Sequence, residues 1–204
     1  MDAEAVRDLA LSASGLLNPK LGGPSVRPPQ PAEVTSQVYG GGGYATSSGA
    51  DRYRRGLYTH LKRGAPFAAS ITFDAPAADS ACLRRVRSNT PLQALTLLND
   101  EVFIEASQAL AQRVIREGGK SMDERIRFLY ECALSRPPTI DEVNRIRTFH
   151  QQQLERFKSG QADAKAVALK FVSKQAEGVD VNELAAWTLV SRAILNLDET
   201  ITKG

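Results

Sequence analysis

The stretch that decides the fold class of this 204-residue chain is Ser88-Asn89-Thr90-Pro91-Leu92-Gln93-Ala94-Leu95-Thr96-Leu97-Leu98-Asn99-Asp100. Thr90 can cap a helix, and Pro91 suits the first helical position because an N–H group there would have no partner. Leucines recur along the stretch at the spacing of one helix face. Asp100 can cap a second helix, which we expect to run to about Glu117. The stretch therefore predicts two helices in immediate succession.

The helical pattern continues from there to the end of the chain. Two capping boxes, in which a hydroxyl and a Glu carboxylate bond each other's backbone N–H groups, open further helices at Ser121–Glu124 and Thr139–Glu142. Two more helices are expected over roughly 162–176 and from about Val181 onward. Residues 53–73 are mixed: Leu57 to Leu61 fits either a short strand or one helical turn, and Ile71 to Phe73 looks extended.

Upstream of the stretch, residues 2–17 are predicted to form a first helix that Asp2 can cap and that Asn18-Pro19 ends. Residues 18–52 are rich in Gly, Pro and Ser, which favours irregular backbone. We predict one domain, made of an N-terminal helix (1–17), this arm (18–52) and a mainly helical part (53–204) that packs with the first helix. The predicted fold is mainly α, with about six helices in bundle-like or orthogonal packing and at most a short strand pair.

Composition and charge exclude several classes of protein. The chain is 42% hydrophobic with a net charge of +3, which excludes a wholly disordered protein. No run reaches the ~18 apolar residues that a membrane span needs. The start, Met1-Asp2-Ala3-Glu4, is acidic, whereas a secretory signal peptide begins with basic residues. We expect a soluble chain without a signal peptide, cytoplasmic if Met1 is its true start, or else the rear part of a longer exported protein.

Metal and nucleophile chemistry have little support in the sequence. Neither Cys82 nor Cys132 belongs to a Cys-x-x-Cys motif, which argues against a zinc site, a thioredoxin-like pair and c-type haem attachment. Both cysteines are expected to be structural, and a disulfide between them stays open in an oxidising compartment. His60 and His150 are isolated, and His150 is expected to be solvated on a Gln-rich helix face. We therefore predict no metal site and no catalytic residue.

Arginines concentrate in one segment of the chain. Residues 51–87 hold eight basic and three acidic side chains, a net charge of +5, against −2 for the remainder. Arg favours bidentate contact with carboxylate, sulfate or phosphate. The candidate anion-binding residues are Arg54, Arg55, Arg84, Arg85, Arg87 and Asn89. In the alternative interpretation these arginines pair with acids of the helical part; nucleic-acid binding is the weaker case, because no reading module is present.

The structural alternative can be made specific. Asp74 is the natural internal partner for an arginine of this segment. We hypothesise that Asp74, Arg54, Arg55 and Arg85 join the loop half of the chain to the helical half through buried ion pairs, which are costly to break.

Several motifs resemble those of a known family. They are Asp2–Asp8, Gly22–Val26, Tyr53–Tyr58, Phe73–Pro76, Arg84–Asp100, Arg136–Thr139 and Ala186–Glu199. Together they resemble the planctomycete-type domain of unknown function (DUF1553) that follows planctomycetal cytochrome c domains in large exported proteins, and this chain resembles its C-terminal portion. The resemblance implies an extracytoplasmic parent protein whose upstream cytochrome c and associated domains are the partners. Haem is implied only for such an upstream domain, so no cofactor is expected in this chain.

The resemblance carries over no catalytic residues, so the function is argued from the arginines. We expect a non-catalytic accessory or binding domain of such an exported, cytochrome-linked protein, holding an anionic ligand such as an acidic polysaccharide. The alternatives are an enzyme domain acting on carbohydrate and a purely structural helical scaffold. A cleft that gathers arginines with an unpaired Asp or Glu would favour the enzyme, and arginines saturated by internal acids would favour the scaffold.

Overall fold

The prediction of a mainly α fold is confirmed. The structure is a computed structural model that describes residues 1–32, 34–35, 43–76, 80–172 and 178–202. Over these residues the chain forms nine α-helices, and its β-structure consists of three isolated bridges. The number of helices exceeds the predicted number of about six for two reasons. α3 (Ala68–Thr72) is too short for apolar periodicity to reveal, and α10 (Asp198–Ile201) is separate from the helix before it. The helix α8 (Ala164–Ala168) is also short. None of the helices in these ranges is both long and apolar enough to cross a membrane.

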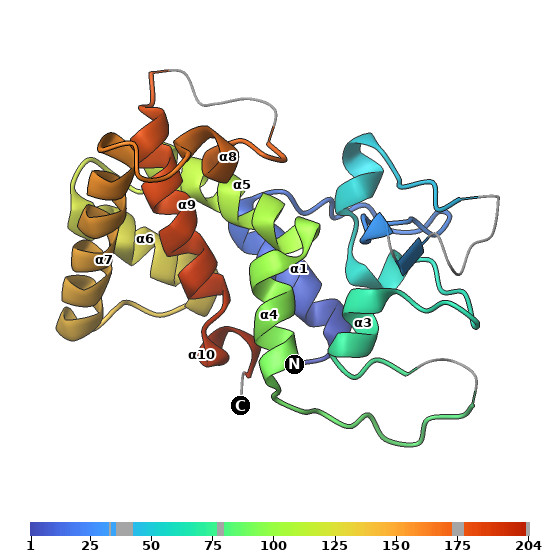
Figure 1. Ribbon diagram of the computed structural model, residues 1–204. Coiled ribbons are helices and arrows are strands. Elements are labelled where there is room, and N and C mark those ends of the chain that lie inside the picture. The colour runs from blue at the N-terminus through green and yellow to red at the C-terminus, as the bar shows by residue number, and fades with distance from the viewer. Residues whose placement is uncertain (33, 36–42, 77–79, 173–177, 203–204) are drawn as a thin grey trace.

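Two long helices, α5 (Glu101–Glu117) and α9 (Val181–Leu195), form the centre of the molecule (Figure 1). α7 (Ile140–Lys158) and α8 pack on α9, whereas α1 (Ala3–Ser14) and α6 (Met122–Leu134) pack on α5. Several of the fully buried apolar side chains of α5 and α9 are small, which lets the two helices pack closely. The fully buried apolar residues are Ala106, Leu110, Ala111 and Val114 on α5, and Leu184, Ala185, Ala186, Trp187 and Val190 on α9.

Helix starts follow the capping residues of the sequence. Capping boxes with both hydrogen bonds present open α6 at Ser121 and α7 at Thr139, and a third opens α4 (Pro91–Asn99) at Thr90. The Asp100 carboxylate accepts a hydrogen bond from Val102 N at 2.9 Å and so caps α5. These starts agree with prediction because a cap depends only on a few neighbouring residues.

The first helix ends earlier than predicted, at Ser14. Gly15 adopts the left-handed conformation with a φ of 77°, and the N–H groups of Leu16 and Leu17 bond back to the carbonyl of Leu11. This is the usual way for glycine to end a helix, so the predicted end at Asn18-Pro19 is wrong. Asp2 does occupy the N-cap position, but its side chain makes no capping hydrogen bond.

Residues 18–26 of the arm lie beside residues 53–60 in the lobe on the opposite side of α1 from α7 (Figure 1). Isolated parallel bridges join Asn18 to Arg54 and Val26 to Thr59. Two 3-10 helices, η2 (Gly49–Tyr53) and η3 (Gly56–Tyr58), shape the backbone that the arm contacts. The expectation that Ile71 to Phe73 is extended is wrong, because Ile71 is helical in α3 and Phe73 is the C-cap of that helix.

The prediction that His150 is solvated is also wrong. Its imidazole is buried on α7 and packs against the Trp187 indole, with the ring centroids 4.7 Å apart. The helix predicted over 162–176 is limited to α8, and residues 173–177 lie outside the described residues. The last predicted helix is divided between α9 and α10, with Leu197 as the N-cap of α10.

Two of the family-like motifs meet at one arginine. The Arg136 guanidinium lies 2.7 Å from Glu142 Oε1 and 2.6 Å from Glu199 Oε2. Its hydrogen bonds lower the pKa of Glu142 to about 2. Arg136 therefore joins the end of α6, the start of α7 and α10.

Candidate functional site

The arginines of residues 51–87 meet the acidic face of α1. Glu4 and Asp8 are four residues apart, so they lie on the same face of the helix. Arg85 donates to both carboxylate oxygens of Glu4, at 2.7 and 3.1 Å. Arg55 Nε donates to Asp8 Oδ2 at 3.1 Å, one turn further along. Two predicted anion-binding residues are thus already engaged by carboxylates of this chain, at the surface rather than in the interior.

Three predicted residues gather at one open concavity. Arg84, Arg85 and Arg87 line it together with Asp2 and Val86, and its volume is about 830 Å³. Arg87 Nη2 lies 3.4 Å from Asp2 Oδ1. Within the described part of the chain, no acidic side chain pairs with the Arg84 guanidinium. The concavity therefore combines one engaged arginine, one loosely paired arginine and one exposed arginine.

The chain is fixed where this arginine segment enters α4. Ser88 N and Oγ both donate to Asp74 Oδ2 at 2.7 Å, and Asn89 donates to Asp198. The hydrogen bonds from Ser88 lower the pKa of Asp74. Gln93, fully buried at the start of α4, donates to Ser88 Oγ at 3.2 Å. Among the described residues the partner of Asp74 is thus Ser88, not an arginine as hypothesised, and Asn89 positions the segment through α10.

Arg54 is separated from the other predicted site residues. It is 1% exposed, and its guanidinium donates to the carbonyls of Pro24 (2.9 Å), Lys20 (3.2 Å) and Gly22 (2.5 Å). Its Cζ lies 3.7 Å from the centroid of the Tyr58 ring, which is cation–π geometry. Arg54 therefore binds the arm to η3 through carbonyls and an aromatic ring, which differs from the ion pair that was hypothesised.

A partly buried polar cluster joins the arm side of the molecule to α5, and the sequence analysis missed it. Arg52 Nη2 lies 2.5 Å from Glu101 Oε1 and 3.0 Å from Glu105 Oε2. Tyr53 Oη donates to Glu105 Oε1 at 2.8 Å, and burial together with this hydrogen bond raises the pKa of Tyr53 to about 12. The signal was the spacing of four between Glu101 and Glu105, which places both on one helix face.

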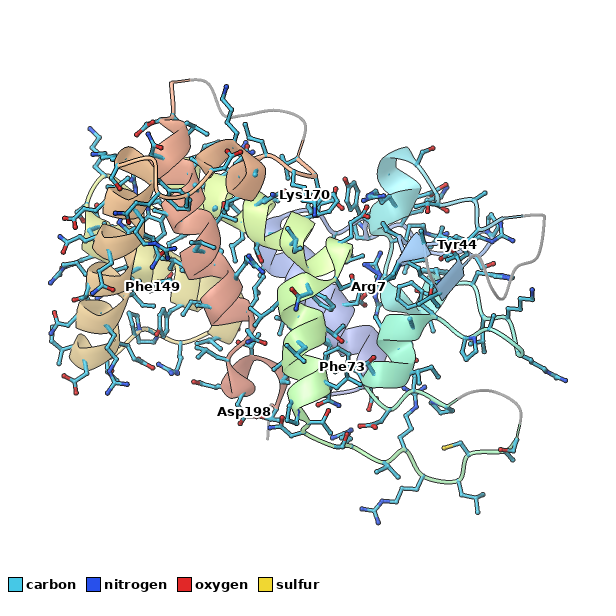
Figure 2. All side chains as sticks on the ribbon, in the orientation of Figure 1. Arg7, Tyr44, Phe73, Phe149, Lys170 and Asp198 are labelled. Atoms are coloured by element: carbon cyan, nitrogen blue, oxygen red, sulfur yellow. The ribbon has the colours of Figure 1, made fainter. Side chains whose placement is uncertain are left out.

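A small cavity lies between α1, α3 and the start of α5. Arg7 and Asp100 line it with three aromatic rings, those of Phe67, Phe73 and Phe103. Burial lowers the pKa of Arg7 to about 10, and Arg7 Nη2 donates to the carbonyl of Arg52 at 2.8 Å (Figure 2). The cavity offers only about 10 Å³ to the centre of a water molecule, which is room for about one water. It is therefore too small to hold a sugar or another substrate.

The described residues bring no metal-binding cluster together: no group of three or more His, Cys, Asp or Glu side chains there is placed to hold a metal ion. Cys82 is exposed and Cys132 is half-buried, and both are free thiols. The two nitrogens of His150 and the indole nitrogen of Trp187 are buried without a hydrogen-bond partner in this part of the chain.

Comparison with known proteins identifies a family for this chain. Residues 1–150 match the family model described as "PSD1: Protein of unknown function (DUF1553)". No curated protein and no solved structure matches the chain.

Proposed function

The chain belongs to the PSD1 family of proteins of unknown function (DUF1553). We propose that it is a non-catalytic accessory domain that binds a carboxylate-bearing partner through Arg84, Arg85 and Arg87. The observation that carries the proposal is the open concavity that these three side chains line. In the larger exported, cytochrome-linked protein that the motif resemblance implies, such a domain would hold an acidic partner near the upstream domains.

The ion pairs between the arginines of this concavity and the acidic residues at the start of α1 are weak enough for an external carboxylate to replace them. The Arg85 and Glu4 side chains are 40% and 32% exposed. An ion pair of this exposure contributes only about 0–1 kcal/mol, because water screens it. An incoming carboxylate can therefore replace Glu4 or Asp2 as a partner at little cost, while Arg84 accepts a new partner directly.

The enzyme alternative has less support at this site. The carboxylates at the concavity, those of Asp2 and the adjacent Glu4, are both engaged by arginines. A general acid or base needs a carboxyl group that can exchange a proton with a substrate. The proposal therefore requires neither a catalytic residue nor a cofactor in this chain.

The proposal is tested with two carboxylate polymers, polyglutamate and polygalacturonate, in titrations of the full chain followed by fluorescence anisotropy. We expect at least one polymer to bind, more tightly at low ionic strength. The variant Arg84→Gln/Arg87→Gln should weaken binding about 5- to 30-fold, corresponding to about 0.5–1 kcal/mol for each exposed contact.

The variant Arg63→Gln/Arg116→Gln removes the same charge from exposed positions elsewhere and should bind like the unmodified chain. If neither polymer binds, or if this control weakens binding as much as the Arg84/Arg87 variant does, the proposal is wrong.

A further inference from the structure

Exposed apolar side chains lie among and beside Arg84, Arg85 and Arg87. In the loop, Leu83 and Val86 are 102% and 74% exposed, and on α4 Leu92 and Leu95 are 60% and 55% exposed. Figure 1 shows the loop before α4 standing away from the helical body. Single exposed leucines are ordinary, but neighbouring exposed apolar side chains mark a surface that a partner covers. Leu92 and Leu95 are such neighbours, because residues three apart lie on the same face of a helix.

α4 exposes leucines on its outer face and carries no charge. Gln93 and Leu97 are buried on its inner side, while Leu92 and Leu95 point outward at a spacing of three. The helix Pro91–Asn99 contains no charged residue. A helix at a protein surface normally places charged or polar residues outward, so the exposed Leu92 and Leu95 depart from the usual pattern.

The first turn of α4, which carries Leu92, is fixed by hydrogen bonds. The Thr90 capping box fixes its start, and the buried Gln93 donates to the carbonyl of Thr72 at 3.0 Å and to Ser88 Oγ. Because Leu92 lies in the turn that these bonds fix, it is presented to a partner with little loss of conformational entropy. A surface ordered in advance binds more tightly than one that must order on binding.

Charge decides which partner fits. Residues 80–99 contain three arginines and no acidic residue; Arg84 has no acidic partner in the described part of the chain, and Arg87 pairs only loosely with Asp2 at 3.4 Å. An occupant that brings carboxylates as well as an apolar face therefore complements this surface. Resting on the proposed function, we infer that the partner is a polypeptide, an amphipathic acidic helix that lays its apolar face on Leu92, Leu95 and Val86 and directs its carboxylates to Arg84 and Arg87. A polysaccharide could satisfy the arginines but would leave the two leucines facing polar groups.

The test uses a fluorescein-labelled synthetic helix with Glu on one face and Leu on the other, and a scrambled peptide of identical composition. The affinity of each probe for the full chain is measured by fluorescence anisotropy. The amphipathic peptide should bind at least about tenfold more tightly than either the scrambled peptide or polyglutamate. Leu92→Gln/Leu95→Gln, which keeps helix propensity, should weaken this binding by at least about tenfold.

A matched control is Leu21→Gln/Leu57→Gln, which changes two equally exposed leucines of the arm lobe and should leave peptide binding unchanged. The inference is overturned if polyglutamate binds as well as the amphipathic peptide, or if polygalacturonate binds better; the proposed function then stands. If no carboxylate probe binds, the proposed function itself fails. If sedimentation shows a dimer that Leu92→Gln/Leu95→Gln abolishes, a second copy of the chain is the occupant and the inference is wrong.

Discussion

Replacing Arg54 by methionine tests whether the arginines of residues 51–87 divide into structural and exposed members. Methionine keeps much of the side-chain volume but removes the guanidinium that holds three arm carbonyls and stacks on Tyr58. Losing the cation–π contact costs about 1 kcal/mol. Each carbonyl loses a charged donor, at roughly 0.5–1 kcal/mol, because water can reach the exposed arm and replace part of the bond. The expected total is roughly 3 kcal/mol.

The assay is thermal unfolding followed by circular dichroism. For a chain of this size, about 3 kcal/mol corresponds to a fall in Tm of about 6–12 °C. Arg55→Met is the matched control, because the neighbouring side chain is 46% exposed and pairs with Asp8 at the surface; it should lower Tm by less than about 4 °C. An Arg54→Met protein with an unchanged Tm, or equal losses for both variants, would refute the reasoning.

Three further predictions follow from the structure. Arg85→Ala removes a surface pair with Glu4, so Tm should fall by less than about 4 °C; a loss as large as that of Arg54→Met would mean that the pair is effectively buried. Burial holds the pKa of His150 below its usual 6.5, so the unfolded chain binds this proton first as pH falls. Stability that is present above about pH 6.5 should therefore be lost as the pH falls toward the lowered native pKa. In urea titrations the variant His150→Phe should lose less stability between about pH 7.5 and 5.5 than the unmodified chain does. An unchanged pH dependence in that variant would contradict the prediction. Gly56→Ala would place a Cβ atom 2.8 Å from Glu4 Cα and its carbonyl oxygen, so the urea midpoint should fall by the equivalent of about 1–3 kcal/mol; a midpoint equal to that of the unmodified chain would show that the two backbones do not approach so closely.

Local sequence signals predicted the helices well. The caps at Thr90, Asp100, Ser121 and Thr139 fix helix starts through bonds to residues two or three positions away. The end of the first helix was missed because Gly15, which terminates it, was read as part of the helix.

The burial of His150 was available in the spacing of α7. His150 lies seven residues, or about two helical turns, from both Val143 and Phe157. All three side chains therefore lie on one face of α7, the face that packs on α9. The neighbouring glutamines suggested a solvated face, although residue spacing is a better guide than composition. The contact with Trp187 itself could not be predicted, because it depends on how two distant helices pack.

The candidate site was predicted in part. Arg84, Arg85 and Arg87 line one concavity, as their closeness in sequence suggested, whereas Asn89 lines a second one that shares Arg87 with it. Arg54 and Arg55 are adjacent in sequence yet have opposite environments, one buried among carbonyls and one at the surface. Composition cannot separate such neighbours, because the difference arises from the arm folding back over residues 49–60.

Binding of a carboxylate polymer at Arg84, Arg85 and Arg87 is measured most directly by amide NMR titrations of the full chain with polyglutamate and, separately, with polygalacturonate. We expect the amide signals that shift to belong to residues 83–95, whereas those of the buried Arg54 and of the arm from Lys20 to Gly23 should not move. Shifts centred on the arm, or no shifts with either polymer, would contradict the proposed binding site.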